Sequence, residues 1–253
     1  MELFDSHAHY NDEKFENEPE ILKEIYNSGV TKLVTAGYNI ESTKKAIEIA
    51  NNYDFVYATA GISPNDIEGI TEKDYEEIKK LAQDKKVVAI GEIGLDYYWN
   101  KENKEKQRYA FIKQIDIANE LNLPIVIHTR EAVQDTIEIL KNNKTKGVFH
   151  CCPLNIELIK EGLKLGFYIS FAGPITFKNS KNAIQVIEYV PMEKILIETD
   201  SPYLSPEPLR GTRNDSRNVK YMAQKIADVK GITVEEVAKK TYENAEHIFS
   251  INT

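Results

Sequence analysis

The chain has 253 residues, of which 42% are hydrophobic and 28% are charged, as is typical of a soluble globular protein with a sizeable core. The formal net charge of −8 provides no overall attraction toward polyanions, so a nucleic-acid partner would need a local basic patch. No apolar run reaches the roughly 18 residues of a membrane span, and the N-terminus lacks the regions of a signal peptide. Because the only two cysteines, Cys151 and Cys152, are adjacent, no disulfide framework is expected, and a cytoplasmic location follows by default.

Short apolar runs alternate with longer amphipathic patterns along the chain. The runs predict strands at residues 1–4, 32–36, 55–62, 87–90, 125–127, 147–150, 167–171 and 195–197. The amphipathic patterns predict helices from about 19 and at 41–51, 74–82, 104–121, 133–140, 156–163, 182–189, 217–229 and 233–249.

Eight strands that alternate with helices in a chain of about 250 residues indicate a single (β/α)8 TIM-type barrel. We expect one domain over residues 1–253, with the segment 233–249 as an additional C-terminal helix. The main rival is a doubly wound open sheet. No glycine-rich G-x-G-x-x-G motif follows the first strand and no polar linker interrupts the alternation, so the barrel is favoured.

The fourth apolar run leads directly into an acidic residue in the sequence V-V-A-I-G-E-I-G-L-D-Y-Y-W, which spans residues 87–99. Glu92 would lie at the end of a buried strand. Removing a carboxylate from water costs several kcal/mol unless the group is paired or bound to a cation. Glu92 is therefore either a ligand or a residue that reaches solvent in the loop after the strand.

Histidines and a second acid follow other predicted strands. The first strand ends in D-S-H-A-H, and strand alternation would direct His7 and His9 to the same face. His128 ends I-V-I-H, His150 ends V-F-H, and Asp200 follows I-L-I-E-T. In a barrel the carboxyl ends of the strands converge on one mouth, so these side chains are expected to meet there.

Four of the five histidines thus fall at predicted strand ends, together with two acids. Imidazole is the commonest ligand for borderline divalent metals, and a carboxylate can bridge two ions. A set of four histidines and two carboxylates is sufficient for two ions about 3.5 to 4 Å apart. No Ser-His-Asp or Cys-His arrangement in the sequence offers a protein nucleophile as an alternative to this metal site.

The same residues carry a resemblance to a known family. The motifs F-D-S-H-A-H, G-E-I-G-L-D-Y-Y, I-H-T-R, H-C, E-T-D-S-P-Y-L and R-G-T-R-N occur over nearly the whole chain. In order and approximate spacing they resemble the TatD family of metal-dependent deoxyribonucleases, within the amidohydrolase-like hydrolases. The resemblance implies a TIM-type barrel that hydrolyses phosphodiester bonds in DNA, often from the 3′ end, with magnesium or a similar ion.

The resemblance also implies roles for individual residues. It makes His7, His9 and Asp200 ligands of a first ion, and His128 and His150 ligands of a second. Glu92 would bridge the two ions, which could be magnesium, manganese or zinc. Asp200 would accept a proton from metal-bound water, whose pKa the ion lowers, so Asp200 and Glu92 are the expected catalytic residues. Asp96 is expected to support the site or the fold.

Three loops depart from the family pattern. Residues 63–65 read Ser-Pro-Asn where the family commonly has a histidine on each side of the proline. Cys152-Pro153 stands in place of Phe-Ser, and Asp215-Ser216 stands in place of Glu-Pro. All three changes are expected in loops over the mouth, where they could alter which phosphoester fits.

Candidate substrate contacts lie in the loops after the fifth, seventh and eighth predicted strands. Arg130, Arg210 and Asn214 are the predicted substrate-binding residues, and Lys178 and Arg213 could also hold phosphates. The alternative for each charged residue is a solvated surface position.

Other residues near these motifs have plainer interpretations. Tyr97, Tyr98 and Trp99 could stack on bases, or could simply pack at the rim. Cys151 is expected to point away from the ligands. His247 is expected on the last helix as a surface or packing residue.

Three functions are weighed. The leading hypothesis is a two-metal hydrolase that cleaves DNA, a 3′-to-5′ exonuclease. The first alternative is a metal-dependent amidohydrolase acting on a small amide or ester. The second is a nucleic-acid-binding protein with a structural metal, which an open ligand set argues against because structural sites are usually closed. DNA is the expected partner, with no membrane and no obligate protein partner.

Overall fold

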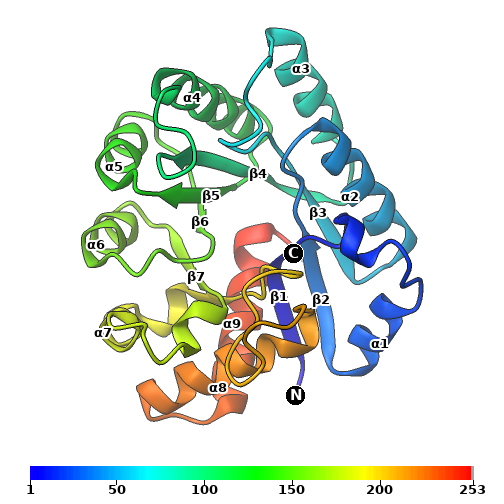
Figure 1. Cartoon of the computed structure of the whole chain (residues 1–253), viewed down its shortest axis with the longest axis vertical. Coiled ribbons are helices and arrows are strands. Elements are labelled where there is room, and N and C mark those ends of the chain that lie inside the picture. The colour runs from blue at the N-terminus through cyan, green and yellow to red at the C-terminus, as the bar shows by residue number, and fades with distance from the viewer. Residues whose placement is uncertain (252–253) are drawn as a thin grey trace.

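In the computed structural model, which describes residues 1–251, eight parallel strands form a ring with helices outside it (Figure 1). Each strand pairs with the next strand along the chain. The strands are β1 Leu3–Ala8, β2 Val30–Thr35, β3 Val56–Ala60, β4 Val87–Asp96, β5 Ile125–Arg130, β6 Gly147–Phe149, β7 Tyr168–Phe171 and β8 Ile195–Ile197. The predicted TIM-type barrel is confirmed.

Helices follow the strands in the predicted alternation. They are α1 Ile21–Asn27, α2 Ile40–Asn52, α3 Glu72–Leu81, α4 Lys104–Glu120, α5 Val133–Asn142, α6 Ile156–Lys164, α7 Ala183–Tyr189, α8 Val219–Lys230 and α9 Val234–Phe249. The additional helix α9 begins at a capping box, in which the Thr233 hydroxyl accepts from the Glu236 N–H at 3.2 Å and the Glu236 carboxylate accepts from the Thr233 N–H at 2.8 Å. No helix within residues 1–251 is both long and apolar enough to cross a membrane.

Three strands continue further at their carboxyl ends than their apolar runs predicted. Strand β1 continues to Ala8, β4 to Asp96 and β5 to Arg130. Gly94 explains part of this extension: its φ is +137°, and a Cβ atom there would lie 2.0 Å from the His128 carbonyl oxygen. The missing side chain lets β4 run close beside β5. The sequence pattern was misleading because glycine and acidic residues are uncommon inside strands.

The ring closes between β8 and β1 through hydrogen bonds made mainly beyond the end of β8. The Asp200 N–H donates to the His7 carbonyl at 2.9 Å, and the His9 N–H donates to the Ser201 carbonyl at 2.7 Å. The buried Asp5 carboxylate accepts from the Thr199 N–H at 2.9 Å. The closing seam therefore fixes the residues on both sides of the mouth.

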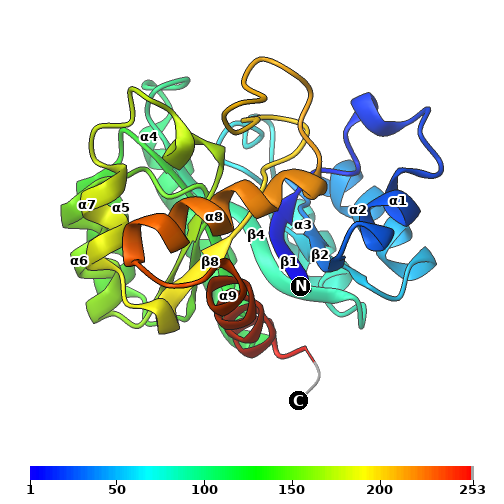
Figure 2. The ribbon, with the colours of Figure 1, turned by 90° about the horizontal axis from the view of Figure 1, so that it is seen from below.

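A compact apolar cluster fills the amino-terminal part of the barrel. Its strand residues include Phe4, Val34, Val88, Val126, Val148, Tyr168 and Leu196. Ile248 and Phe249 of α9 pack against them, with the Phe249 and Phe4 rings 6.2 Å apart. Figure 2 shows α9 beneath the strands, on the side opposite the loop after β8. A larger cluster packs the sheet against the outer helices. The barrel is thus closed at one end, and polar residues gather at the other.

Candidate metal centre

Six residues predicted as metal ligands come from five different strands and lie together at the carboxyl-terminal end of the barrel. Four are buried and two are partly exposed. They are His7, His9, Glu92, His128, His150 and Asp200. Residues from β1, β4, β5, β6 and β8 meet because parallel strands in a closed ring end at the same rim.

Glu92 lies between two pairs of histidines. Its Oε2 atom is 3.6 Å from His7 Nε2 and 3.7 Å from His9 Nε2. Its Oε1 atom is 2.9 Å from His128 Nδ1 and 3.2 Å from His150 Nε2. The two oxygens of one carboxylate therefore face two different imidazole pairs.

Asp200 lies beside the first pair. Its Oδ1 atom is 3.3 Å from His9 Nε2 and 3.8 Å from His7 Nε2. The residue has a left-handed backbone with φ of 56°, and its N–H is bonded to His7 as described above. The loop after β8 therefore turns sharply and directs this carboxylate into the mouth.

Three groups of three residues each could hold a metal ion, because the ligand atoms within each group lie within 4.8 Å of one another. The groups are His7, His9 and Glu92; His7, His150 and Asp200; and Glu92, His128 and His150. Cys151 belongs to none of the groups found in residues 1–251.

Opposite charges offset burial in this centre. Burial alone would raise the pKa of Glu92, but the imidazoles of His150, His128 and His7 hold it well below its usual value. Burial alone would lower the pKa of His128, yet hydrogen bonds to Asp96 and Glu92 raise it to about 9. Burial alone would raise the pKa of Asp200, but the nearby His9 lowers it, so that the pKa is below its usual value. The carboxylates are thus compensated by nearby positive charge, which a bound cation also supplies.

The donor set fits divalent cations. His150 Nε2, the ring nitrogen that faces Glu92, is buried and makes no well-oriented hydrogen bond to any residue of the described part of the chain. Such buried polar atoms cost free energy unless they find a partner. Imidazole nitrogens and carboxylate oxygens together suit borderline metals, and carboxylates also suit harder ones. The centre is therefore able to hold metal.

Two histidines are backed by carboxylates on the ring nitrogen that points away from Glu92. His128 Nε2 lies 2.9 Å from Asp96 Oδ2, and His150 Nδ1 lies 3.3 Å from Glu198 Oε1. His9 Nδ1 instead contacts a backbone carbonyl, that of Ala36, at 3.2 Å. An outer carboxylate fixes ring orientation and tautomer and makes the imidazole a stronger ligand.

Two supporting acids were missed in the sequence. Glu198 is fully buried and precedes Asp200 by two residues, so strand alternation was the signal that could have identified it. Asp5 is also fully buried, and accepts hydrogen bonds from Thr199 Oγ1 at 2.6 Å and from Ser216 Oγ. Asp5 precedes His7 by two residues on β1, so the same alternation could have identified it, although its partners Thr199 and Ser216 lie 194 and 211 residues away.

Of the three predicted substrate contacts, two are exposed and one is buried. Arg130 and Arg210 are exposed at the rim, with Arg130 at the end of β5 and Arg210 in the loop between β8 and α8. Asn214 differs from the expectation because it is fully buried and its amide donates to the Thr199 and Tyr203 carbonyls at 2.9 and 2.8 Å. It holds the loop that carries Asp200 and offers no surface to a substrate.

Some of the other candidate residues are engaged by the fold, and others are exposed. Arg213 is engaged in an ion pair with Glu18, whereas Lys178 is exposed. Tyr97 is buried and its hydroxyl lies 2.5 Å from an Asp135 oxygen, so it packs at the rim. Tyr98 and Trp99 are exposed. His247 lies on α9 near the Tyr168 ring, away from the centre.

The loops that depart from the family pattern contact the centre through its supports. Asn65 Nδ2 lies 3.4 Å from Asp96 Oδ2, the atom behind His128. Ser63 Oγ donates to Asp66 at 2.7 Å. Ser216 reaches Asp5 as described above. Asn65 and Ser216 are therefore each separated from a ligand, His128 and His7, by one acidic residue.

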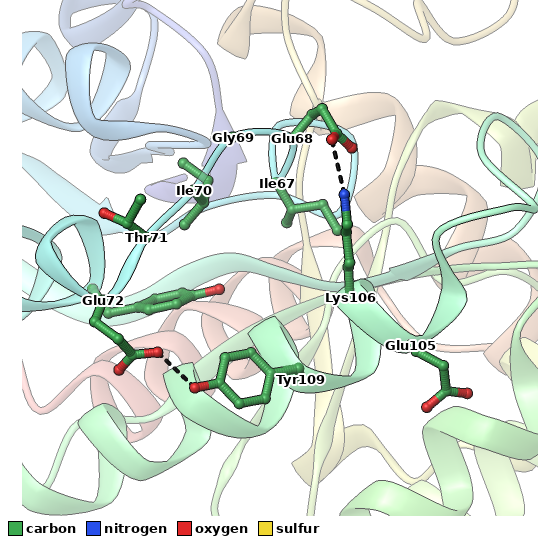
Figure 3. A pocket seen from close by; sticks show the side chains of 10 residues that line it. Ile67, Glu68, Gly69, Ile70, Thr71, Glu72, Glu105, Lys106 and Tyr109 are labelled. Atoms are coloured by element: carbon green, nitrogen blue, oxygen red, sulfur yellow. Dashed lines mark hydrogen bonds and ion pairs between the residues drawn. The ribbon is translucent and has the colours of Figure 1, made fainter.

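A surface cleft of about 540 Å³ lies elsewhere, between the segment before α3 and the start of α4 (Figure 3). Glu68 pairs with Lys106 at 2.8 Å, and Glu72 accepts from the Tyr109 hydroxyl at 2.6 Å. None of the six centre residues lines it. The candidate metal centre lies instead at the mouth of the barrel.

Comparisons with known proteins agree with the geometry. The family model described as TatD related DNase matches residues 4–250. The chain is 43% identical to the uncharacterized metal-dependent hydrolase YabD of Bacillus subtilis, covering 99% of this chain and all of that protein. It is 36% identical to the uncharacterized metal-dependent hydrolase YcfH of Escherichia coli, covering 100% of this chain and 97% of that protein.

Solved structures share the fold. The TatD homolog YJJV of Escherichia coli superposes with a TM-score of 0.93 at 24% identity, covering 98% of each chain. A TatD family hydrolase from Entamoeba histolytica superposes with a TM-score of 0.87, also at 24% identity and 98% coverage of each chain. With a full-length family match and relatives well above 30% identity, the chain belongs to the TatD family of metal-dependent hydrolases.

Proposed function

We propose that this hydrolase cleaves phosphodiester bonds in DNA with two divalent cations and removes nucleotides from the 3′ end. The observation that carries the proposal is the position of Glu92, whose two oxygens face two separate imidazole pairs. A carboxylate in that position suits a bridge between two ions.

In this proposal His7, His9 and Asp200 hold one ion, and His128 and His150 hold the other. When bound, the ions, whether magnesium, manganese or zinc, supply Lewis acidity at the phosphoryl oxygen and lower the pKa of water. Asp200 is ionised at neutral pH because its carboxyl pKa is below its usual value, so it is available to accept the proton of the attacking water. Glu92 orients both halves of the centre.

The arginines support a phosphate-bearing substrate. Carboxylates within the described chain pair with three of the five arginines, Arg108, Arg213 and Arg217. Arg130 and Arg210 make no ion pair with any residue of 1–251, and each lies over an aromatic ring. Both are at the mouth, where an unpaired guanidinium can bind phosphate oxygens in spite of the acidic net charge.

The alternatives have unequal support. Membership of a hydrolase family argues against a binding protein with a purely structural metal. A metal-dependent amidohydrolase acting on a small amide or ester uses the same centre, but it gives no role to the unpaired arginines. We also propose that residues 1–253 act as one domain, and that the protein is cytoplasmic, in keeping with two free thiols.

Hydrolysis assays test the proposal. Protein stripped with EDTA and resupplied with magnesium, manganese or zinc should release 5′-mononucleotides from single-stranded or duplex DNA labelled at the 3′ end. Glu92→Gln serves as the inactive control. Failure to cleave any DNA with all three metals, together with turnover of small amides or esters, would replace the nuclease by the amidohydrolase.

A further inference from the structure

The most exposed large apolar side chain in residues 1–251, Trp99, lies at the mouth beside the metal centre. Trp99 is 68% exposed and the neighbouring Tyr98 is 45% exposed, with their rings edge to face and 4.9 Å apart. The Arg130 guanidinium carbon lies 3.8 Å from the centre of the Tyr98 ring and 5.5 Å from that of Trp99. We refer to Tyr98, Trp99 and Arg130 as the rim cluster.

One carboxylate connects the rim cluster to the metal centre. Asp96 Oδ1 accepts from the Tyr98 N–H at 3.0 Å and from the Trp99 N–H at 3.1 Å. Asp96 Oδ2 is the atom that backs His128. The turn that presents both aromatic rings is thus fixed relative to a ligand of the centre.

Strand geometry also directs Arg130 toward the centre. It follows His128 by two residues on β5, so the two side chains share one face and lie about 7 Å apart along the strand. The guanidinium lies over the Tyr98 ring and makes no ion pair within residues 1–251, so its N–H groups are available to a phosphate. A flat aromatic ring next to an available guanidinium matches a nucleotide, which has a flat base and an anionic phosphate.

We propose that the rim cluster binds an unpaired base of the DNA strand by stacking on Trp99 while Arg130 holds an adjacent phosphate. This inference rests on the proposed function. Inside a duplex each base is covered on both faces by its neighbours, and the terminal pair of a blunt end offers only its outer face. An unpaired base offers both faces and is free to turn toward Trp99, so it is the better partner for stacking. Stacking accepts every base, so little sequence preference follows.

Trp99 is the only tryptophan of the chain, so its fluorescence reports directly on this site. The metal-loaded full chain is titrated with three hydrolysis-resistant phosphorothioate probes: a single-stranded oligodeoxyadenylate, an abasic strand of the same length, and a blunt-ended hairpin. The oligodeoxyadenylate should quench Trp99 and bind about tenfold more tightly than the other two, within the range of base stacking on aromatic residues. Equal affinity for the base-containing and abasic strands would overturn the proposal.

Variants separate the base from the phosphate. Trp99→Ala and Tyr98→Ala should each raise KM for single-stranded DNA about tenfold with little change in kcat. Arg130→Ala should also weaken the binding of the abasic strand, and should reduce the salt dependence of binding by about one charge. Wild-type KM in Trp99→Ala would contradict the stacking role.

Tyr189→Ala is the matched control. Tyr189 is 48% exposed and has the Lys160 amine 5.5 Å from its ring centre, but it lies at the end of α7 that leads to the start of β8. It is therefore at the other end of the barrel, and its removal should leave KM unchanged.

Failure of this inference can be distinguished from failure of the nuclease proposal. DNA hydrolysis without a preference for unpaired bases would overturn the stacking site alone. Tight, base-dependent quenching without hydrolysis would overturn the nuclease alone.

Discussion

At the amino-terminal end of the barrel the strands carry apolar side chains that pack against α9, whereas at the carboxyl-terminal end the same strands carry imidazoles and carboxylates. Phe4 lies in the apolar cluster and His7 in the metal centre, only three residues apart on β1. The apolar end removes hydrocarbon from water and stabilises the fold. The polar end buries ionisable groups, which costs stability unless they are compensated.

The residues that stabilise the fold and the residues of the candidate metal centre therefore lie at opposite ends of the same strands. Variants at the mouth should change metal binding and hydrolysis while the barrel stays folded. Variants at the closed end should change stability while the centre keeps its affinity for metal.

The largest effect on function is expected from Glu92→Gln. Neutralising the carboxylate between both imidazole pairs should lower metal occupancy and reduce hydrolysis by more than about 100-fold, because even outer partners of metal ligands are worth roughly 10- to 100-fold. Elemental analysis and DNA hydrolysis measure the two effects, and circular dichroism checks the fold. Normal occupancy with normal activity would contradict the bridging role.

The largest effect on stability is expected from Phe249→Ala. Phe249 is buried between α9 and the strand residues of the closed end, so its truncation should cost about 3 to 5 kcal/mol of unfolding free energy. Denaturant unfolding measures the loss, and isothermal titration should find unchanged metal affinity in the folded protein. A large loss of metal affinity would show that the two ends are coupled. Phe249→Leu, which leaves a smaller cavity, should be milder.

A smaller effect on metal binding is expected from substituting the acids that lie behind the second imidazole pair, His128 and His150. Asp96→Asn and Glu198→Gln should each weaken one of two metal-binding events by about 10- to 100-fold and spare the other, because only His128 and His150 have an outer carboxylate. Isothermal titration resolves the two events. Asp116→Asn, at an exposed site on α4, is the control. Equal weakening of both events would reject the assignment.

The smallest effect is expected from Asn65→His, which restores a residue common in the family. Asn65 is exposed and its contact with Asp96, at 3.4 Å, is long for a hydrogen bond. Metal affinity should change by less than about threefold, since hydrogen bonds of this kind contribute under 1 kcal/mol. A tenfold loss in metal titrations would show instead that Asn65 maintains the centre.

Local patterns in the sequence predicted the strands and helices, and the position of each proposed ligand at a strand end. They also identified Asp96 as a support. These predictions succeeded because strand and helix periodicities act over a few residues, and because strand ends in a barrel converge. The patterns missed the full length of β4, where glycine permits an approach to β5 that no local rule describes.

Local periodicity specifies the eight strand-and-helix units and the six candidate ligands near their ends. Contacts between separate segments of the chain specify that the oxygens of Glu92 face separate imidazole pairs, that Glu198 and Asp5 support the centre, and that Asn214 is buried. The same packing specifies which arginines make no ion pair within residues 1–251 and that α9 closes the far end. Each of these contacts joins residues far apart in the chain, and their distances depend on how the closed ring sets strand stagger and tilt.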